Sequence, residues 1–271
     1  MDLLLTEDEN RKRIRKVENS FGPSGMPLSI PGRVLIGEGK LRKQGRKKQE
    51  LKAFFLFNDV LVYGSVIMNG RWYKKQKVIP LEDVEIEDLE NSESMQHQWL
   101  ISTPRKSFFV SATTGLEKQA WMEHIRDCRS RVLEDKDVKP SANYAMSWIP
   151  DKAAQKCMRC LKKFSYINRK HHCRKCGFVV CNECSRKREF IKYINSNHEV
   201  RICKVCYEID EDDKDKDSSR QRGDSSGMHS SKEEEEEEEG AMSSDEEQIQ
   251  TSSSWLDTKT GTWGRLSAIC S

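Results

Sequence analysis

The sequence lacks any apolar run that approaches the roughly 18 residues of a membrane-spanning helix. Its N-terminal leucine run covers only Leu3–Leu5 and follows Asp2, whereas a secretory signal needs a basic start and a longer apolar stretch. We therefore expect a cytoplasmic or nuclear chain, in a compartment that keeps thiols reduced. In such a compartment the ten cysteines are expected to bind metal rather than to form disulfides.

Apolar residues are also scarce. They make up 35% of the 271 residues, while charged residues make up 34%. An ordinary globular chain has about 45–50% apolar residues, glycine included, so part of this chain is not expected to pack. The net charge of +3 hides an uneven distribution. Residues 148–208 carry 15 basic and 5 acidic side chains, whereas residues 209–271 carry 7 basic and 18 acidic side chains. A basic module beside an acidic segment predicts an anionic partner for the module.

The first 33 residues are predicted to form a leader with a short helix. Ile14, Val17 and Phe21 fall at helical spacing, and three prolines follow before residue 32. Prolines end regular structure, so the helix stops before them. We expect the apolar stripe to pack on the next domain. A helix lying on a membrane surface is the alternative, for which three apolar residues are few.

Seven short strands and a helix are predicted next. The strand candidates are Val34–Leu41, Ala53–Phe57, Val60–Tyr63, Trp72–Ile79, Val84–Ile86, Trp99–Thr103 and Ser107–Ala112. Thr114–Glu117 fits a capping box at the start of the helix. The predicted buried face of this helix consists of Leu116, Trp121, Ile125, Cys128 and Val132. Seven strands and one C-terminal amphipathic helix resemble a pleckstrin homology (PH) domain, whose most recognisable residue is the helix tryptophan, here Trp121.

Eight of the cysteines form four Cys-x-x-Cys pairs. The predicted metal ligands are Cys157, Cys160, Cys173, Cys176, Cys181, Cys184, Cys203 and Cys206. Each pair supplies two thiolates, so the eight fill two tetrahedral zinc sites. The short gap between the second and third pairs is accommodated when the first and third share one zinc and the second and fourth share the other. Four sulfurs leave no position for water or substrate, so both Zn2+ ions are predicted to be structural.

Three motifs surround these cysteines. Arg169–Arg174 reads RKHHCR, Trp148–Asp151 reads WxxD, and Arg201–Cys203 reads RIC. They resemble the FYVE family, whose motifs are (R/K)(R/K)HHCR, WxxD and RVC. RING and PHD modules, which also bind two zinc ions, normally include a histidine among their ligands, whereas all eight predicted ligands here are cysteines. A PH domain followed by a FYVE domain and an acidic tail resembles the Phafin family, and the tail is more like that of its longer form.

The resemblance implies binding to phosphatidylinositol 3-phosphate. The implied headgroup residues are Trp148, Asp151, Arg169, Lys170, His171, His172, Arg174 and Arg201. The basic side chains suit the phosphates, while Asp151 and His172 would meet the ring hydroxyls. A carboxylate there would also repel lipids phosphorylated at ring positions 4 or 5. Tyr166 and Ile167 lie at the tip of the loop that enters the bilayer in FYVE domains, with Phe164 packed inside.

A basic cluster also lies in the predicted first hairpin of the PH domain. It consists of Lys40, Arg42, Lys43, Arg46, Lys47, Lys48 and Lys52. Lipid-binding PH domains carry such a cluster. Where they usually have Lys-x-Arg, however, this chain has the sequence ELK at Glu50–Lys52. A protein-binding or structural PH domain therefore stays open as the alternative.

The C-terminal segment is predicted to be a disordered acidic tail. Only five of the 46 residues from Ile209 to Ser254 are apolar, and the segment includes the run Glu233–Glu239. Such a segment buries too little surface to offset its ordering entropy. The stretch with Trp255 and Trp263 is either a peptide ligand for some partner or merely a tail.

The predicted fold class is an α+β multidomain chain: a seven-stranded PH-type β-barrel capped by a C-terminal helix, a small two-zinc FYVE-type finger and a disordered acidic tail. The predicted order is leader 1–33, PH domain 34–135, linker 136–147, FYVE-type zinc finger 148–208 and tail 209–271. Cys128 and Cys270 lie outside the zinc set and have no motif typical of a nucleophile.

The predicted function is that of a non-enzymatic adaptor. It would bind phosphatidylinositol 3-phosphate and other anionic lipids, and no nucleic acid. It would lie peripherally on early endosomes and on lysosomes, with a nuclear or perinuclear pool. The family resemblance implies roles in endosome maturation and fusion, receptor trafficking, autophagy and lysosome-linked apoptosis. The alternative is a zinc-dependent protein-interaction factor, either a RING-like ubiquitin ligase or a nuclear factor.

Overall fold

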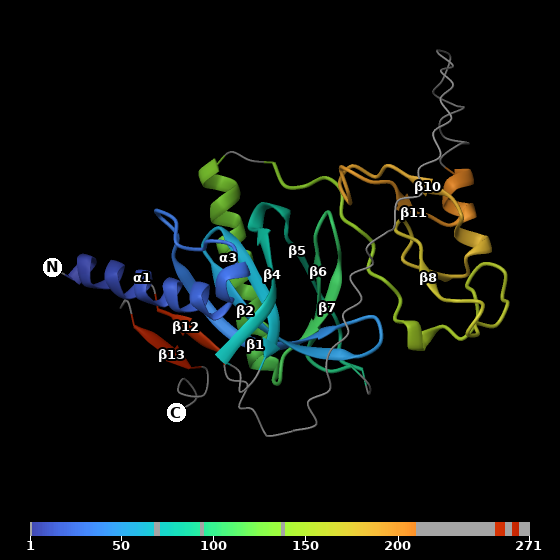
Figure 1. Ribbon diagram of the computed structural model, residues 1–271. Helices are drawn as coiled ribbons and strands as arrows, with labels where there is room; N and C mark the ends of the chain where they lie inside the picture. Colours follow the sequence, from blue (N-terminus) through green and yellow to red (C-terminus); the bar gives the residue numbers. More distant parts are fainter. Residues whose placement is uncertain are drawn as a thin grey trace, which may run out of the picture.

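A computed structural model describes residues 2–67, 71–92, 95–136, 139–209, 253–257 and 262–265. Figure 1 shows a larger lobe, in which a strongly curved sheet is crossed by one helix, beside a smaller lobe of loops and short strands. Within the described residues, no helix combines the length and apolarity that crossing a bilayer requires.

The larger lobe has the predicted PH-type sheet. Its strands are β1 (Leu35–Gln44), β2 (Gln49–Phe57), β3 (Val60–Ile67), β4 (Trp72–Pro80), β5 (Glu85–Asp88), β6 (Gln98–Ser102) and β7 (Phe108–Ser111). They are ordered β4-β3-β2-β1-β7-β6-β5, and every neighbouring pair is antiparallel. All seven predicted strands are present, with ends shifted by a few residues. The short helices η1 (Gly22–Ser24) and η2 (Leu81–Asp83) lie in the connections.

Strand β2 is apolar on both faces because both faces are covered. Phe54 and Leu56 point into the core under helix α3 (Gly115–Lys136). Phe55 and Phe57 point to the opposite face, where they pack with residues of helix α1 (Asp2–Ser20) and the chain after it. The helix residues are Ile14 and Val17, with Phe21 just beyond the helix. The leader helix thus packs on the sheet and is longer than the short helix that was expected.

Helix α3 begins at the predicted capping box. The Glu117 amide donates to Thr114 Oγ1 at 3.2 Å, and the Glu117 carboxylate accepts from the Thr113 amide at 3.0 Å. Trp121, Ile125, Cys128 and Val132 are buried, as predicted, but Leu116 is 58% exposed. At about 100° per residue, Leu116 is displaced by roughly 140° around the helix from Trp121, so its place on the buried face was wrong.

The smaller lobe contains the cysteines. Its elements are η3 (Asp151–Ala153), β8 (His171–His172), β9 (Val179–Val180), η4 (Glu183–Ser185), β10 (Arg188–Glu189) and β11 (Val200–Arg201). Strand β8 pairs with β9, and β10 pairs with β11. Half of the eight buried residues in its core are cysteines. The linker before it is tied to the PH domain by the Ala145 amide, which donates to the Thr103 carbonyl at 3.0 Å.

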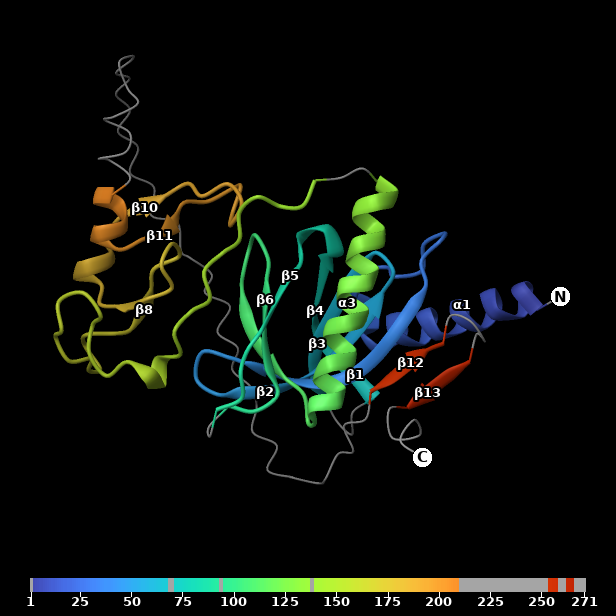
Figure 2. The same cartoon turned by 180° about the vertical axis from the view of Figure 1, so that it is seen from behind.

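Two stretches of the predicted disordered tail form strands. These are β12 (Ser254–Leu256) and β13 (Trp263–Arg265), which pair with each other. Strand β12 also pairs with β1. Figure 2, from behind, shows the two strands beside β1 and α1, far from the smaller lobe. The expectation of disorder through residue 271 is therefore wrong for these strands, while residues 210–252, including Glu233–Glu239, lie outside the described residues.

Candidate zinc and lipid-headgroup site

The eight cysteines gather into two quartets. Their ligand atoms lie within 4.8 Å of one another in each quartet. One quartet consists of Cys157, Cys160, Cys181 and Cys184, and the other of Cys173, Cys176, Cys203 and Cys206. This confirms the predicted cross-braced pairing. The Cys181 amide donates to Cys157 Sγ at 3.3 Å, and the Cys203 amide to Cys173 Sγ at 3.2 Å, which suits thiolates bound to zinc.

Arg159 supports the second quartet, a role that the sequence analysis did not assign. Its guanidinium donates to Cys203 Sγ at 3.3 Å and to Cys176 Sγ at 3.4 Å. Four thiolates outweigh the charge of one zinc ion, so a fixed cation beside them stabilises the site. The only signal in the sequence is its place inside the first Cys-x-x-Cys pair, where it reaches the sulfurs of the other quartet.

The predicted headgroup residues of the basic motif meet around Trp148. The indole ring stacks on the His172 ring, with centroids 4.8 Å apart. The Arg174 guanidinium lies 4.1 Å from the indole centroid, and Lys106 of the PH domain lies 5.1 Å from it. His172 Nε2 lies 2.8 Å from the Ile149 carbonyl. Burial lowers the pKa of His172, so the neutral imidazole donates this hydrogen bond.

Asp151 is held from both lobes. Lys170 Nζ donates to the Asp151 carbonyl at 2.6 Å, and Arg46 Nε donates to Asp151 Oδ2 at 2.8 Å. Arg46 also donates to the Lys170 carbonyl at 2.9 Å. The other carboxylate oxygen, Oδ1, is buried and accepts no hydrogen bond within the described parts of the chain. The first hairpin of the PH domain therefore contacts the WxxD motif directly. The sequence analysis did not predict this contact.

Arg201 and Arg169 are placed differently from each other. Arg201 is only 8% exposed, and its guanidinium donates to the Ser185 carbonyl at 2.9 Å and to Asn182 Oδ1 at 3.1 Å. The Arg174 amide donates to the Arg201 carbonyl at 2.9 Å, which places the two arginines side by side. Arg169, the first residue of the motif, lies 6.0 Å from the centre of the Tyr166 ring.

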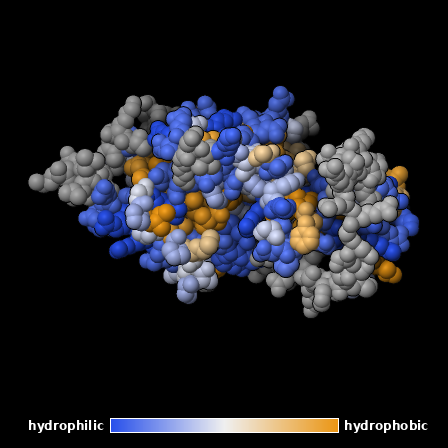
Figure 3. All heavy atoms as spheres, turned by 90° about the horizontal axis from the view of Figure 1, so that it is seen from above, coloured by the Kyte–Doolittle hydropathy of each residue, from blue (hydrophilic) through white to orange (hydrophobic). Residues whose placement is uncertain are grey.

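The predicted insertion loop presents its apolar tip. Tyr166 is 89% and Ile167 93% exposed. The Ser165 amide donates to the Asn168 carbonyl at 3.1 Å, which closes the loop beneath them. Phe164 is half-buried against the cysteine core, as expected. Figure 3 shows apolar side chains at the outer edge of the zinc-finger end of the molecule.

The predicted basic cluster of the PH domain does not form one exposed surface. The exposed members are Arg42, Lys47 and Lys48, the partly buried members are Lys40 and Arg46, and the buried members are Lys43 and Lys52. Lys52 donates to Ser65 Oγ at 2.7 Å and pairs with Glu50 at 2.8 Å. Lys43 lies 4.6 Å from the centre of the Phe108 ring. Three side chains therefore stay exposed for an anionic surface.

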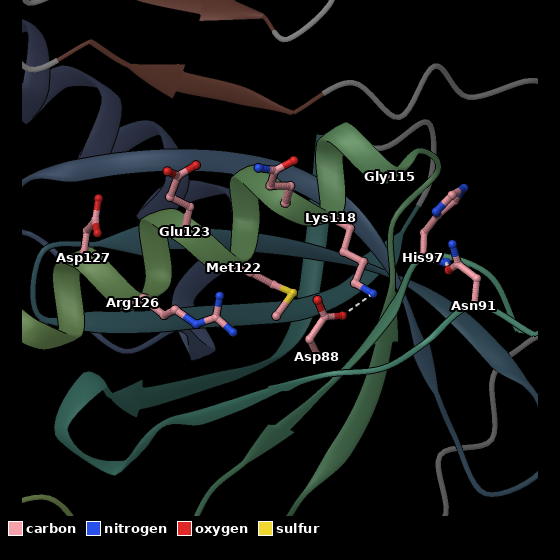
Figure 4. Close-up of a pocket in the computed structure, with 10 residues that line it drawn as sticks. Asp88, Asn91, His97, Gly115, Lys118, Met122, Glu123, Arg126 and Asp127 are labelled. Carbon is pink, nitrogen blue, oxygen red and sulfur yellow. Dashed lines mark hydrogen bonds and ion pairs between the residues drawn. The ribbon is translucent and has the colours of Figure 1, made fainter.

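A separate hollow lies on the outer face of α3. It has a volume of about 530 Å³ and charges of both signs on its lining. Figure 4 shows Lys118 and Asp88 pointing toward each other across it, and they form an ion pair. That pairing lowers the pKa of Asp88. On the inner side of the same helix, burial raises the pKa of Cys128 to about 11, which fits a core thiol rather than a nucleophile.

Comparison with known proteins agrees with this geometry. Residues 35–130 match the PH domain model and residues 147–211 match the FYVE zinc finger model. FYVE zinc fingers bind two zinc ions, in agreement with the two quartets. Together the two domains indicate a phosphoinositide-binding adaptor that lies on membranes peripherally.

Curated relatives match most of the chain. The chain is 50% identical to human pleckstrin homology domain-containing family F member 2, over 77% of this chain and 84% of the relative. It is 46% identical to human family F member 1, over 84% of this chain and 82% of the relative. At this identity and coverage, the chain belongs to the pleckstrin homology domain-containing family F, the Phafin family.

Proposed function

We propose that this protein is a non-enzymatic adaptor that recognises phosphatidylinositol 3-phosphate on endosomal and lysosomal membranes. The observation that carries the proposal is the cluster of Arg174, His172 and Trp148 beside Lys170 and the partly buried Asp151 carboxylate. Cations and a carboxylate close together suit a ring that carries phosphates at some positions and hydroxyls at others. The carboxylate disfavours lipids with further phosphates near it.

The exposed loop tip supports binding to a membrane rather than to a soluble phosphate. Burying Ile167 in a bilayer would contribute about 1.5–3 kcal/mol. Near an anionic surface each lysine or arginine adds about 1 kcal/mol. The exposed Arg42, Lys47 and Lys48 would add such a contribution from the PH domain. Roles in endosome maturation and fusion, receptor trafficking, autophagy and lysosome-linked apoptosis follow from the family only.

Sedimentation with liposomes that each contain one phosphoinositide tests the proposal. The full chain should sediment with vesicles that contain phosphatidylinositol 3-phosphate and less with the other lipids. Arg174→Ala should abolish this preference, because it removes a phosphate donor. Arg186→Ala is a matched control, since Arg186 is an exposed arginine of the same domain outside the basic motif. Equal sedimentation with every phosphoinositide, or equal loss in both variants, would refute the assignment.

A further inference from the structure

The tail strand β12 covers a part of β1 that the PH sheet leaves open. Strand β7 pairs with β1 only at Arg42 and Lys43. Toward the start of β1, Gly37 pairs with Trp255 and Glu38 pairs with Ser254. Figures 1 and 2 both show β12 and β13 at this end of β1, opposite the zinc-finger lobe. Tail and lipid site are therefore at different ends of the molecule.

Two glycines make room for the tail. A Cβ atom at Gly37 would lie 2.3 Å from the Trp255 ring, and a Cβ atom at Gly39 would lie 2.3 Å from Ser253 Oγ. Residues two apart in a strand face the same side, so both glycines open one face of β1. Glycine inside a strand commonly marks the close approach of another chain segment. Here the spacing of the glycines matches the spacing of Ser253 and Trp255.

A pair of polar groups from α3 holds the serine hydroxyl. Trp121 Nε1 donates to Ser253 Oγ at 2.9 Å, and Ser253 Oγ donates to Glu117 Oε1. Ser253 is fully buried and Glu117 is 4% exposed. One donor and one carboxylate that meet at a single oxygen select a group that both accepts and donates, which is a hydroxyl. Without the serine, both buried groups would lose this partner, which costs free energy.

The tryptophan fills the space next to this hydroxyl. Trp255 is 7% exposed, and its ring lies edge-on to Trp121 with centroids 4.8 Å apart. His124 stacks on its face at 4.1 Å. In the second strand of the hairpin, Trp263 lies 4.3 Å from the Arg13 guanidinium of α1. The tail hairpin thus contacts β1, α3 and α1.

We propose that Gly37, Gly39, Glu117, Trp121 and His124 form a peptide-binding site, called the tail slot here. Its ligand class is an extended peptide with the pattern Ser-x-Trp, which adds a strand to β1. The occupant is the chain's own segment Ser253–Asp257, bound in cis. The 43 residues between Ile209 and Ser253 are enough to connect the two lobes, since each residue can extend by about 3.3 Å. A tethered ligand outcompetes a free one because its effective concentration is high.

The test uses the full chain and a fluorescent peptide with the sequence of residues 250–266. Trp255→Ala removes the main contact of the tethered tail and so opens the slot to the peptide. This variant should bind the peptide, measured by fluorescence anisotropy, at least tenfold more tightly than the wild-type chain does. A peptide that carries Ser253→Ala should bind at least tenfold more weakly than the unaltered peptide.

A second variant closes the slot. The double variant combines Gly37→Ala with Trp255→Ala. Its added methyl group lies where the peptide's tryptophan would bind, and the chain's own Trp255 ring, which it would otherwise contact, has been removed. This double variant should not bind the peptide. Gly115→Ala in the same background is the control at a glycine outside the slot, because its added Cβ would meet only His97, at an ordinary contact distance of 3.6 Å, and peptide binding should be retained.

A measurement on the wild-type chain guards against variants that unfold. Amide exchange at the start of β1, where β12 pairs with Gly37 and Glu38, should be slow, and it should become faster in Ser253→Ala. No peptide binding by the Trp255→Ala chain, or unchanged exchange in Ser253→Ala, would overturn the proposal. The proposal would also be overturned if light scattering showed that the wild-type chain is a dimer and that Trp255→Ala is a monomer. The slot would then hold the tail of a second copy.

Discussion

The PH domain buries large apolar side chains on both faces of its sheet, whereas the zinc finger buries few besides its cysteines. Trp99, Trp121 and Phe54 are almost completely buried in the first core. In the zinc finger, four of the eight buried core residues are cysteines. A module of about 60 residues is only marginally stable from burial alone, so one in which half of the buried core residues are cysteines depends on its metal. The two domains therefore respond to different disruptions.

The largest effect is expected from removal of zinc. A strong chelator should unfold residues 148–208 and leave the PH domain folded, because metal binding supplies the folding free energy of so small a module. Hydrogen exchange resolved along the chain measures both domains in one experiment. We expect β8 to β11 to lose protection while β1 to β7 keep theirs. Unchanged protection of the zinc finger would contradict a structural role for the metal.

The converse disruption is a cavity in the PH core. Phe54→Ala should lower the free energy of unfolding of the PH domain by about 3–5 kcal/mol. Two zinc ions should still be bound, as counted by native mass spectrometry. Lys47→Ala, at an exposed position of the same hairpin, should change stability little. Loss of zinc in Phe54→Ala would mean that the two domains do not fold independently.

A smaller effect is expected at the loop tip of the zinc finger, where Tyr166 and Ile167 are both strongly exposed. Ile167→Ala should weaken binding to vesicles that contain phosphatidylinositol 3-phosphate by roughly tenfold, because less apolar surface enters the bilayer. Binding of the soluble headgroup, measured by calorimetry, should not change. Leu116→Ala removes an exposed apolar side chain from α3, outside the zinc finger, and serves as control. A similar loss in both variants would argue against insertion of this loop.

The smallest effect is expected where the two domains meet. Arg46 and Asp151 are partly exposed, so their ion pair should contribute no more than about 1 kcal/mol and should weaken with salt. A double-mutant cycle with Arg46→Ala and Asp151→Asn measures it in denaturant unfolding. Arg42→Ala, an exposed arginine of the same hairpin, should show no coupling to Asp151. Coupling of several kcal/mol would show that the domains stabilise each other strongly.

Local patterns were sufficient for much of the fold. Short runs rich in apolar and aromatic residues, separated by turn residues, predicted seven strands. The Cys-x-x-Cys spacing predicted two quartets, because four thiolates complete one tetrahedral zinc site. Leu116 shows the limit of such patterns: it lies near the apolar stripe in sequence but on another side of the helix in space.

The sequence by itself determined the domains, the zinc ligands and the headgroup motifs, since these depend on residue type and short spacing. Only the tertiary structure decided where distant segments meet. It brought Arg46 to Asp151, and it brought Ser253 and Trp255 onto the two glycines of β1. The tail's composition, taken alone, predicted disorder through residue 271. Residues 253–257 are ordered because β1 offers backbone groups for pairing and α3 offers a matched donor and acceptor, and neither is visible from the tail's own composition.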